Sequence, residues 1–304
     1  MRLQPEGISL HYTDTGPENS APVLLLHGGG SSNATWARLT AELAVRGYRV
    51  IAPDLRGHGA SPRSADYRLL SYHTDVDRML TKLNLGALDV VGHSLGGYIA
   101  LTVAQQAPAR VRRLIVEEPA APSQGGRRRH ISRARMVLGG LRHRRFDPAA
   151  IRSVITELGQ PDDTWWHRLP GITAPTLLLR GGPGSHLDQG DLAAIGRLIP
   201  HCQQITIPVG HRIHSGAPET FNAAVLTFLS TCDAGDSEEP AASRESQRPD
   251  SQEEGCPSVG AVGEADDARD GRDAASGATR DAKEAEAAVL PWVDQALQAG
   301  SRGS

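Results

Sequence analysis

The chain has 304 residues, of which 39% are hydrophobic, with 33 glycines, three cysteines and a formal net charge of −3. Residues 233–304 hold 17 acidic and 7 basic side chains, a net charge of −10, which leaves 18 acidic and 25 basic side chains in residues 1–232, a net charge of +7. With no nucleic-acid-binding motif beside it, this charge split argues against nucleic acid as a partner.

The cysteines and the N-terminus bear on metal binding and on location. Cys202, Cys232 and Cys256 are widely spaced and form no C-x-x-C pair, so they predict neither a zinc site nor a disulfide framework. The N-terminal MRLQPEGISLHY has no apolar stretch of signal-peptide length, and no window approaches the roughly 20 apolar residues of a membrane span. We therefore expect a cytoplasmic protein without a membrane span; the sequence leaves its oligomeric state open.

Apolar runs and helical patterns alternate along the first part of the chain. Strands are predicted at 7–13, 23–26, 48–52, 88–91 and 114–116, and helices at 34–46, 72–84 and 95–107. Short runs without polar residues suit strands buried on both faces. The alternation predicts an α/β fold, a mostly parallel sheet with helices on both faces.

The alternation stops between about residues 119 and 175, where helical patterns follow one another without a strand, and a small inserted helical cap explains this best. Strands resume at 176–179 and 203–207, and a last helix is predicted at 218–230. We therefore assign residues 1–231 to one domain. Residues 232–304 form an acidic tail with too little apolar content to offset the entropy of ordering it, and we expect it to be disordered.

The segment Gly92-His93-Ser94-Leu95-Gly96 matches the G-x-S-x-G nucleophile elbow. A predicted strand precedes it and a predicted helix follows it, which is the strand-turn-helix setting that the motif requires. Glycines flank the serine because the turn is strained and side chains there would collide with the helix and the sheet. The pattern predicts Ser94 as a catalytic nucleophile at the carboxyl end of the sheet.

A second glycine-rich turn, His27-Gly28-Gly29-Gly30, follows the strand at 23–26. Glycine allows the close approach and unusual dihedral angles that a backbone N–H needs in order to face the nucleophile. The N–H groups of Gly29 and Leu95 would form a two-donor oxyanion hole.

Together these segments resemble the α/β-hydrolase superfamily over residues 7–231. The resemblance is carried by HGGG at 27–30 with Trp36 shortly after it, APDLRGHGAS at 52–61, GHSLGG at 92–97, and Gly210-His211. It implies an acyl hydrolase with a Ser-His-acid triad. Because relatives carry the base on the loop between the last strand and the last helix, it also implies His211 as the general base. The nearby His214 completes an H-x-x-H spacing, but no carboxylate helix motif accompanies it and we predict no metal.

The acid is less directly indicated. Relatives usually place an Asp shortly after the strand at 176–179, where this chain has Gly184, with Asp188 four residues further on. Other relatives take the acid from the end of the strand after the nucleophile helix, which here is Glu117-Glu118. Adjacent strand residues point to opposite faces, so at most one of the two can face His211. Alignment on Arg110-Val111 favours Glu118.

The sequence therefore predicts hydrolysis of an ester, thioester or related small acyl substrate through an acyl-enzyme, without a cofactor. A carbon-carbon bond hydrolase, an amidase, and a non-catalytic binding protein that keeps the fold remain alternatives. An arginine run between 127 and 145 in the cap could be a solvated face, an anion-binding surface or a contact for the acidic tail.

Overall fold

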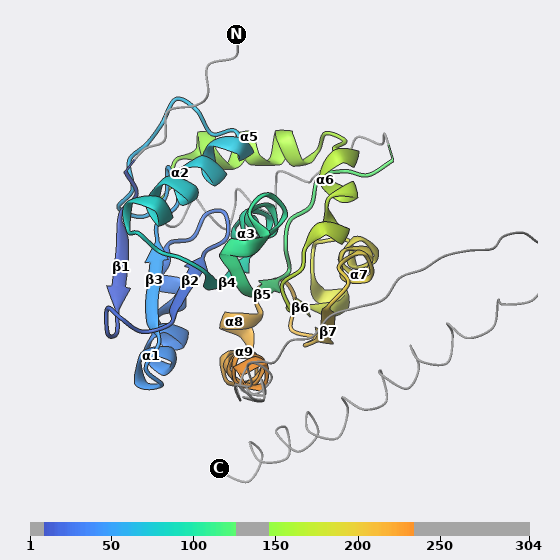
Figure 1. Cartoon of the computed structure of the whole chain (residues 1–304). Helices are drawn as coiled ribbons and strands as arrows, with labels where there is room; N and C mark the ends of the chain where they lie inside the picture. The colour runs from blue at the N-terminus through green and yellow to red at the C-terminus, as the bar shows by residue number, and fades with distance from the viewer. Residues whose placement is uncertain (1–8, 126–145, 234–304) are drawn as a thin grey trace, which may run out of the picture. The chain divides into compact units, whose positions relative to one another are not determined.

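The computed structural model describes residues 9–125 and 146–233, all within the first of the chain's two units, residues 1–238. Its centre is a seven-stranded sheet in the order β1-β3-β2-β4-β5-β6-β7 (Figure 1). The strands are β1 Tyr12–Thr15, β2 Pro22–Leu26, β3 Arg49–Pro53, β4 Leu88–His93, β5 Val111–Glu117, β6 Thr176–Arg180 and β7 Cys202–Thr206. β1 pairs antiparallel with β3, and all other neighbours pair parallel.

Helices cover both faces of this sheet (Figure 1). They are α1 Ala37–Val45, α2 Leu69–Lys82, α3 Leu95–Gln106, α5 Pro148–Leu158, α6 Asp163–His167, α7 Gln189–Leu198, α8 Ile213–Gly216 and α9 Pro218–Asp233. Residues from α2, α3, the cap and α7 form one buried apolar cluster, and residues from α1 and α9 form another. The predicted α/β class is confirmed.

The strand β2 shows why a central strand can lack polar residues. Leu24 and Leu26 belong to one apolar cluster, whereas Val23 and Leu25 belong to the other, and all four are fully buried. Alternate residues of a strand face opposite sides of the sheet, so in β2, which is covered on both sides, every position from Val23 to Leu26 is apolar.

The insertion between β5 and β6 is helical where the structure describes it. It contains α5, α6 and a 3₁₀ turn at Leu169–Gly171, with no strand among residues 118–125 and 146–175. Trp165 stacks on Tyr98 of α3 with ring centroids 5.6 Å apart, and its Nε1–H donates to Thr102 Oγ1 at 3.2 Å. These contacts tie the cap to α3. The arginine run and the acidic tail lie outside the described residues.

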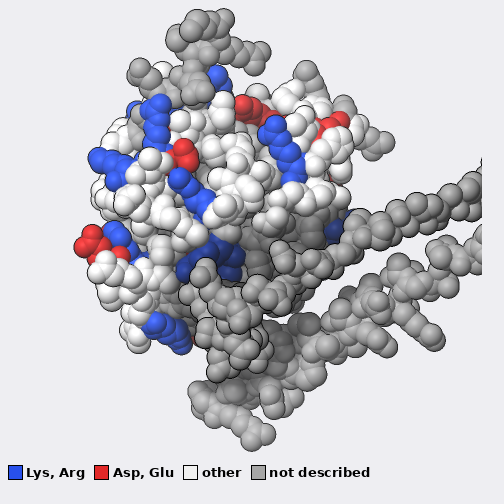
Figure 2. Space-filling view, in the orientation of Figure 1, with Lys and Arg blue, Asp and Glu red and all other residues white. Residues whose placement is uncertain are grey.

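Charged side chains are spread over the face drawn in Figure 2, some basic ones beside acidic ones. Exposed pairs such as Arg68 with Asp66, whose nitrogen and oxygen are 2.8 Å apart, contribute little to stability because water and salt screen them. Among the described helices, none combines the length and apolar composition that crossing a membrane requires.

Candidate active site

Ser94 lies at a sharp turn between β4 and α3. Its backbone has φ 53° and ψ −112°, a conformation that is strained for a residue with a side chain. The neighbouring glycines are required sterically, since a Cβ atom on Gly96 would lie 2.1 Å from the carbonyl oxygen of Leu26, and one on Gly92 would lie 2.4 Å from that of Gly96. The turn therefore holds the serine at the carboxyl end of the parallel strands.

The glycine-rich loop after β2 approaches this serine. A Cβ atom on Gly28 would lie 3.2 Å from Ser94 Cβ and 2.5 Å from His93 Nδ1, so only glycine fits. Next to it, Gly29 faces the cap, because a Cβ atom there would lie 3.1 Å from Ile151 Cδ1 of α5. Leu95 begins α3, and the first N–H groups of a helix have no partner within the helix.

His27 fixes the backbone of the same loop. Its Nδ1 lies 2.8 Å from the carbonyl oxygen of Gly28, which only accepts, while its Nε2 lies 3.0 Å from the N–H of Leu55, which only donates. Nδ1 therefore carries the proton. Burial, reinforced by neighbouring His58, lowers the pKa of His27 to about 3, so the ring stays neutral and keeps this arrangement.

The structure brings His211 and Glu118 together. His211 Nδ1 is 3.3 Å from Glu118 Oε2, and the glutamate is fully buried. The carboxylate also accepts the Gly181 N–H at 2.5 Å, the Gln189 side-chain amide at 3.1 Å and the hydroxyl of Ser185. A buried carboxylate with this many donors is held in one orientation and in its charged form.

The pKa of Glu118 predicts how stability depends on pH. Burial alone would raise this pKa, but the hydrogen bonds from His211, Ser185, Gly181 and Gln189 together lower it below the ordinary value. A lowered folded-state pKa gives stability that is present above the unfolded value of about 4.3 and lost as pH falls through the folded value.

We therefore expect Glu118→Gln to lose less unfolding free energy than wild type as the pH is lowered. Urea unfolding between pH 3 and 6 should show the difference in unfolding free energy between wild type and variant shrinking as the pH falls below about 4.3. A difference that stays constant over this range would contradict the lowered pKa. Glu219→Gln, at an exposed residue of α9, is the matched control.

The other two candidate acids have different partners. Glu117 is fully buried and binds His214, whose backbone N–H lies 3.0 Å from Oε1 and whose Nδ1 lies 2.7 Å from Oε2. Asp188 is exposed and caps α7, accepting the N–H groups of Gly190 and Asp191. Of the three carboxylates that the sequence left open, only Glu118 is hydrogen-bonded to His211.

Three residues near this pair were not predicted from the sequence. Ser185 and Gln189 bind the Glu118 carboxylate, and the ring of His186 lies against that of His211, with centroids 4.1 Å apart. They belong to the segment after β6 that carries Gly184. A Cβ atom added to Gly184 would lie 3.5 Å from the Cα atom of Gly210, the residue before His211. The position where many relatives carry the acid thus does lie next to the His211 loop.

Within the described residues, no hydrogen bond joins Ser94 Oγ to the ring of His211. The two residues are nonetheless connected through His93, which precedes the serine: its Nε2 lies 2.9 Å from the carbonyl oxygen of His211, and the two rings have centroids 4.7 Å apart. Catalytic hydrogen bonds are often long or poorly aligned before substrate binds.

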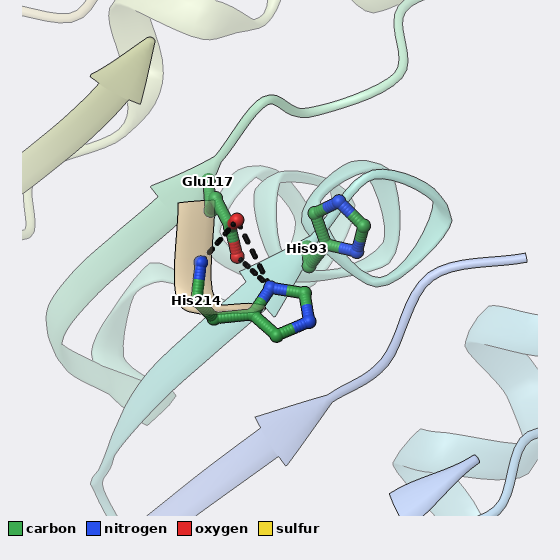
Figure 3. A group of neighbouring side chains, drawn as sticks. All are labelled: His93, Glu117 and His214. Atoms are coloured by element: carbon green, nitrogen blue, oxygen red, sulfur yellow. Dashed lines mark hydrogen bonds and ion pairs between the residues drawn. The ribbon is translucent and has the colours of Figure 1, made fainter. Parts of the chain in front are cut away.

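One cluster of described side chains has the composition of a metal site. His93, Glu117 and His214 each offer one ligand atom, all within 4.8 Å of one another (Figure 3). In Figure 3 the dashed hydrogen bonds join Glu117 only to His214, while His93 Nε2 faces the His211 carbonyl. Glu117 and His214 are already hydrogen-bonded to each other, and His93 Nε2 is bonded to a backbone carbonyl, so we propose no metal for this cluster.

Comparison with known proteins agrees with the fold. Residues 21–133 match the family model described as the alpha/beta hydrolase fold. The chain is 29% identical over 269 residues to mouse sn-1-specific diacylglycerol lipase ABHD11, covering 75% of this chain and 86% of that protein. It is 34% identical over 146 residues to lipase LipV of Mycobacterium tuberculosis, covering 48% of this chain and 54% of LipV.

A solved structure extends the likeness to three dimensions. The thermophilic esterase from Thermogutta terrifontis superimposes with a TM-score of 0.58 at 27% identity, covering 73% of this chain and 93% of the esterase. The residues matched by the family model, 21–133, include β4, Ser94 and α3. The chain belongs to the α/β-hydrolase superfamily and is a hydrolase enzyme.

Proposed function

We propose that this hydrolase cleaves ester, thioester or related acyl bonds with Ser94 as nucleophile, His211 as general base and Glu118 as the acid of the triad. The observation that carries the proposal is the buried Glu118 carboxylate hydrogen-bonded to His211, beside a serine on a strained strand-to-helix turn. The relatives named as lipases support an acyl substrate.

In the first step His211 Nε2 takes the proton from Ser94 Oγ as this oxygen attacks the substrate carbonyl carbon. The imidazolium that forms keeps its Nδ1–H on Glu118, whose negative charge stabilises it. Glu118 itself is held by donors from Gly181, Ser185 and Gln189, so its orientation does not change during attack. This preorganisation lowers the barrier without a cofactor.

The tetrahedral intermediate places negative charge on the former carbonyl oxygen. The N–H groups of Gly29 and Leu95 are the proposed donors to it, since Gly28 adjoins Ser94 and Leu95 begins α3. His211 then donates its proton to the leaving group, and an acyl-enzyme remains on Ser94. Water, activated by His211, attacks this ester and releases the acid and the free serine.

The first experiment is covalent labelling of the full chain with a fluorophosphonate, together with turnover of p-nitrophenyl esters of increasing acyl length. We expect one label per chain, located on Ser94 by peptide mass spectrometry, and loss of ester turnover in proportion to labelling. The reagent reacts only with an activated serine.

Ser230→Ala, at an exposed serine of α9, should label and turn over as wild type does. Labelling at another serine, or full turnover after Ser94 is labelled, would refute the assignment. The acyl length that gives the highest kcat/KM then defines the substrate class.

A further inference from the structure

The residues immediately before the proposed nucleophile and acid form a pair of their own. His93 ends β4, Glu117 ends β5, and the two are register partners in the parallel sheet. Their side chains are buried at the sheet's carboxyl edge, with His93 5% exposed and Glu117 fully buried. Both contact one segment, residues 210–214, which carries His211, includes the first two residues of α8, and is called the His211 loop below.

Each of the two residues holds a different point of this loop. His93 Nε2 lies 2.9 Å from the carbonyl oxygen of His211. Glu117 accepts the backbone N–H of His214 at 3.0 Å and the ring Nδ1–H at 2.7 Å, and Figure 3 shows both bonds. The far side of the same ring is held too, because His214 Nε2 lies 2.8 Å from Thr35 Oγ1.

We propose that His93, Glu117 and His214 are positioning residues that fix the His211 loop directly to the two strand ends carrying Ser94 and Glu118. The inference rests on the proposed function, since it assumes that His211 is the base. The H-x-x-H spacing is then explained without a metal: the first histidine does the chemistry and the second anchors the loop. None of the three need touch substrate.

The hydrogen-bond partners of His93 determine which of its ring nitrogens carries the proton. A carbonyl oxygen only accepts, so His93 Nε2 carries the proton and donates to His211. Burial, with His211 and His214 close by, holds the pKa of His93 well below its usual value, so it remains neutral. Its other nitrogen, Nδ1, has no hydrogen-bond partner and lies against Gly28, where a side chain would collide. The ring is thus confined between the glycine-rich loop and the base.

Such a device affects rate more than binding. Misplacing a catalytic group by about 1 Å can cost about 10²-fold in rate. The base must meet Ser94 Oγ on one side and Glu118 on the other. His93 precedes Ser94, and Glu117 precedes Glu118. Because the His211 loop is bonded to His93 and Glu117, a small shift of either strand moves His211 together with the residue that it must meet.

The test compares two substitutions at His214 in the full chain. In His214→Asn the amide nitrogen takes the place of Nδ1 and still donates to Glu117, whereas His214→Leu has similar bulk and no donor. We expect His214→Leu to lower kcat by about 10- to 100-fold with KM changed less than about 2-fold. His214→Asn should recover most of that loss. Each kcat is divided by the fraction of chains that fluorophosphonate labels on Ser94 once labelling has reached its end point, so that neither unfolded chains nor a slower labelling rate affects the comparison.

The controls separate positioning from other roles. His201→Leu, at an exposed histidine just before β7, should leave kcat unchanged. Wild-type kcat per labelled site in His214→Leu, or equal losses in the Leu and Asn variants, would overturn the proposal. If His214→Leu does not fold, Glu117→Gln decides: it keeps shape but loses one acceptor, and unchanged kcat per labelled site there would likewise overturn it.

Further outcomes distinguish the positioning role from a metal site and from failure of the proposed function. A thermal stabilisation of wild type by added Zn²⁺ that is absent in Glu117→Gln would mean that the cluster is a metal site and the positioning role is wrong. Full turnover in Ser94→Ala would refute the proposed function instead. Loss of turnover in Ser94→Ala together with normal kcat per labelled site in His214→Leu and Glu117→Gln would refute only the positioning role.

Discussion

Ser94→Ala and His211→Ala are each expected to lower kcat by about 10⁴- to 10⁶-fold, and the double variant is expected to be little worse than either single one. The reason is that the serine is a poor nucleophile without a base, and the base has nothing to activate without the serine. Ester hydrolysis by purified variants, with folding checked by circular dichroism, measures the effect. KM is expected to change little, because neither side chain is proposed to bind the substrate's acyl group.

Penalties that multiply in the double variant would contradict a triad acting as one unit. The matched controls are Ser230→Ala and His201→Ala, which replace the same residue types at exposed positions and should keep wild-type kcat. Residual activity in His211→Ala that disappears in a His211→Ala/His186→Ala double variant would assign the base to His186, whose ring lies against that of His211.

The sheet and most helices could be predicted because their signals are local. A strand such as β2 is apolar throughout, and helices such as α3 carry a continuous apolar character that ends at a proline. The helix α7 was missed for a physical reason. It contains Gly190 and Gly196, which lower helix propensity. The glycine at 196 is dictated by tertiary packing, since a Cβ there would lie 2.3 Å from Gln204 Cδ of β7.

The candidate site also contains residues that local sequence patterns identify and residues that only the tertiary structure places. Ser94 is recognisable because strand, turn and helix adjoin it in the sequence. The partner of His211 has no such local signal, and only alignment with relatives favoured Glu118, because the choice between Glu117 and Glu118 depends on how the chain leaves β5. Glu118 lies just beyond the strand with φ 46°, which turns it toward His211 while Glu117 faces His214. The donors that hold Glu118 come from the loop after β6, whose approach no local pattern encodes.

Glu118→Gln is expected to lower kcat by about 10⁴-fold while the enzyme stays folded. The reason lies in the hydrogen bonds to the two carboxylate oxygens. Oε1 accepts from Gly181 and Gln189, and Oε2 accepts from Ser185 and His211. Whichever oxygen becomes an NH₂ group will face two donors.

An NH₂ group on the Oε2 side would face His211 Nδ1 and favour the tautomer with its proton on Nε2, which cannot accept the proton of Ser94. An NH₂ group on the Oε1 side would leave His211 its acceptor but remove the charge that stabilises the imidazolium. Both arrangements therefore lower kcat, and the slow step moves to attack by Ser94, so fluorophosphonate labelling of Ser94 should slow in parallel with ester turnover.

Glu117→Gln should lower kcat less, by about 10- to 100-fold, because it loosens the loop that carries His211. Asp188→Asn should change kcat little, because asparagine also caps helices well. If Asp188→Asn instead proves the damaging change, the loop after β6 must supply the acid and the Glu118 assignment is wrong.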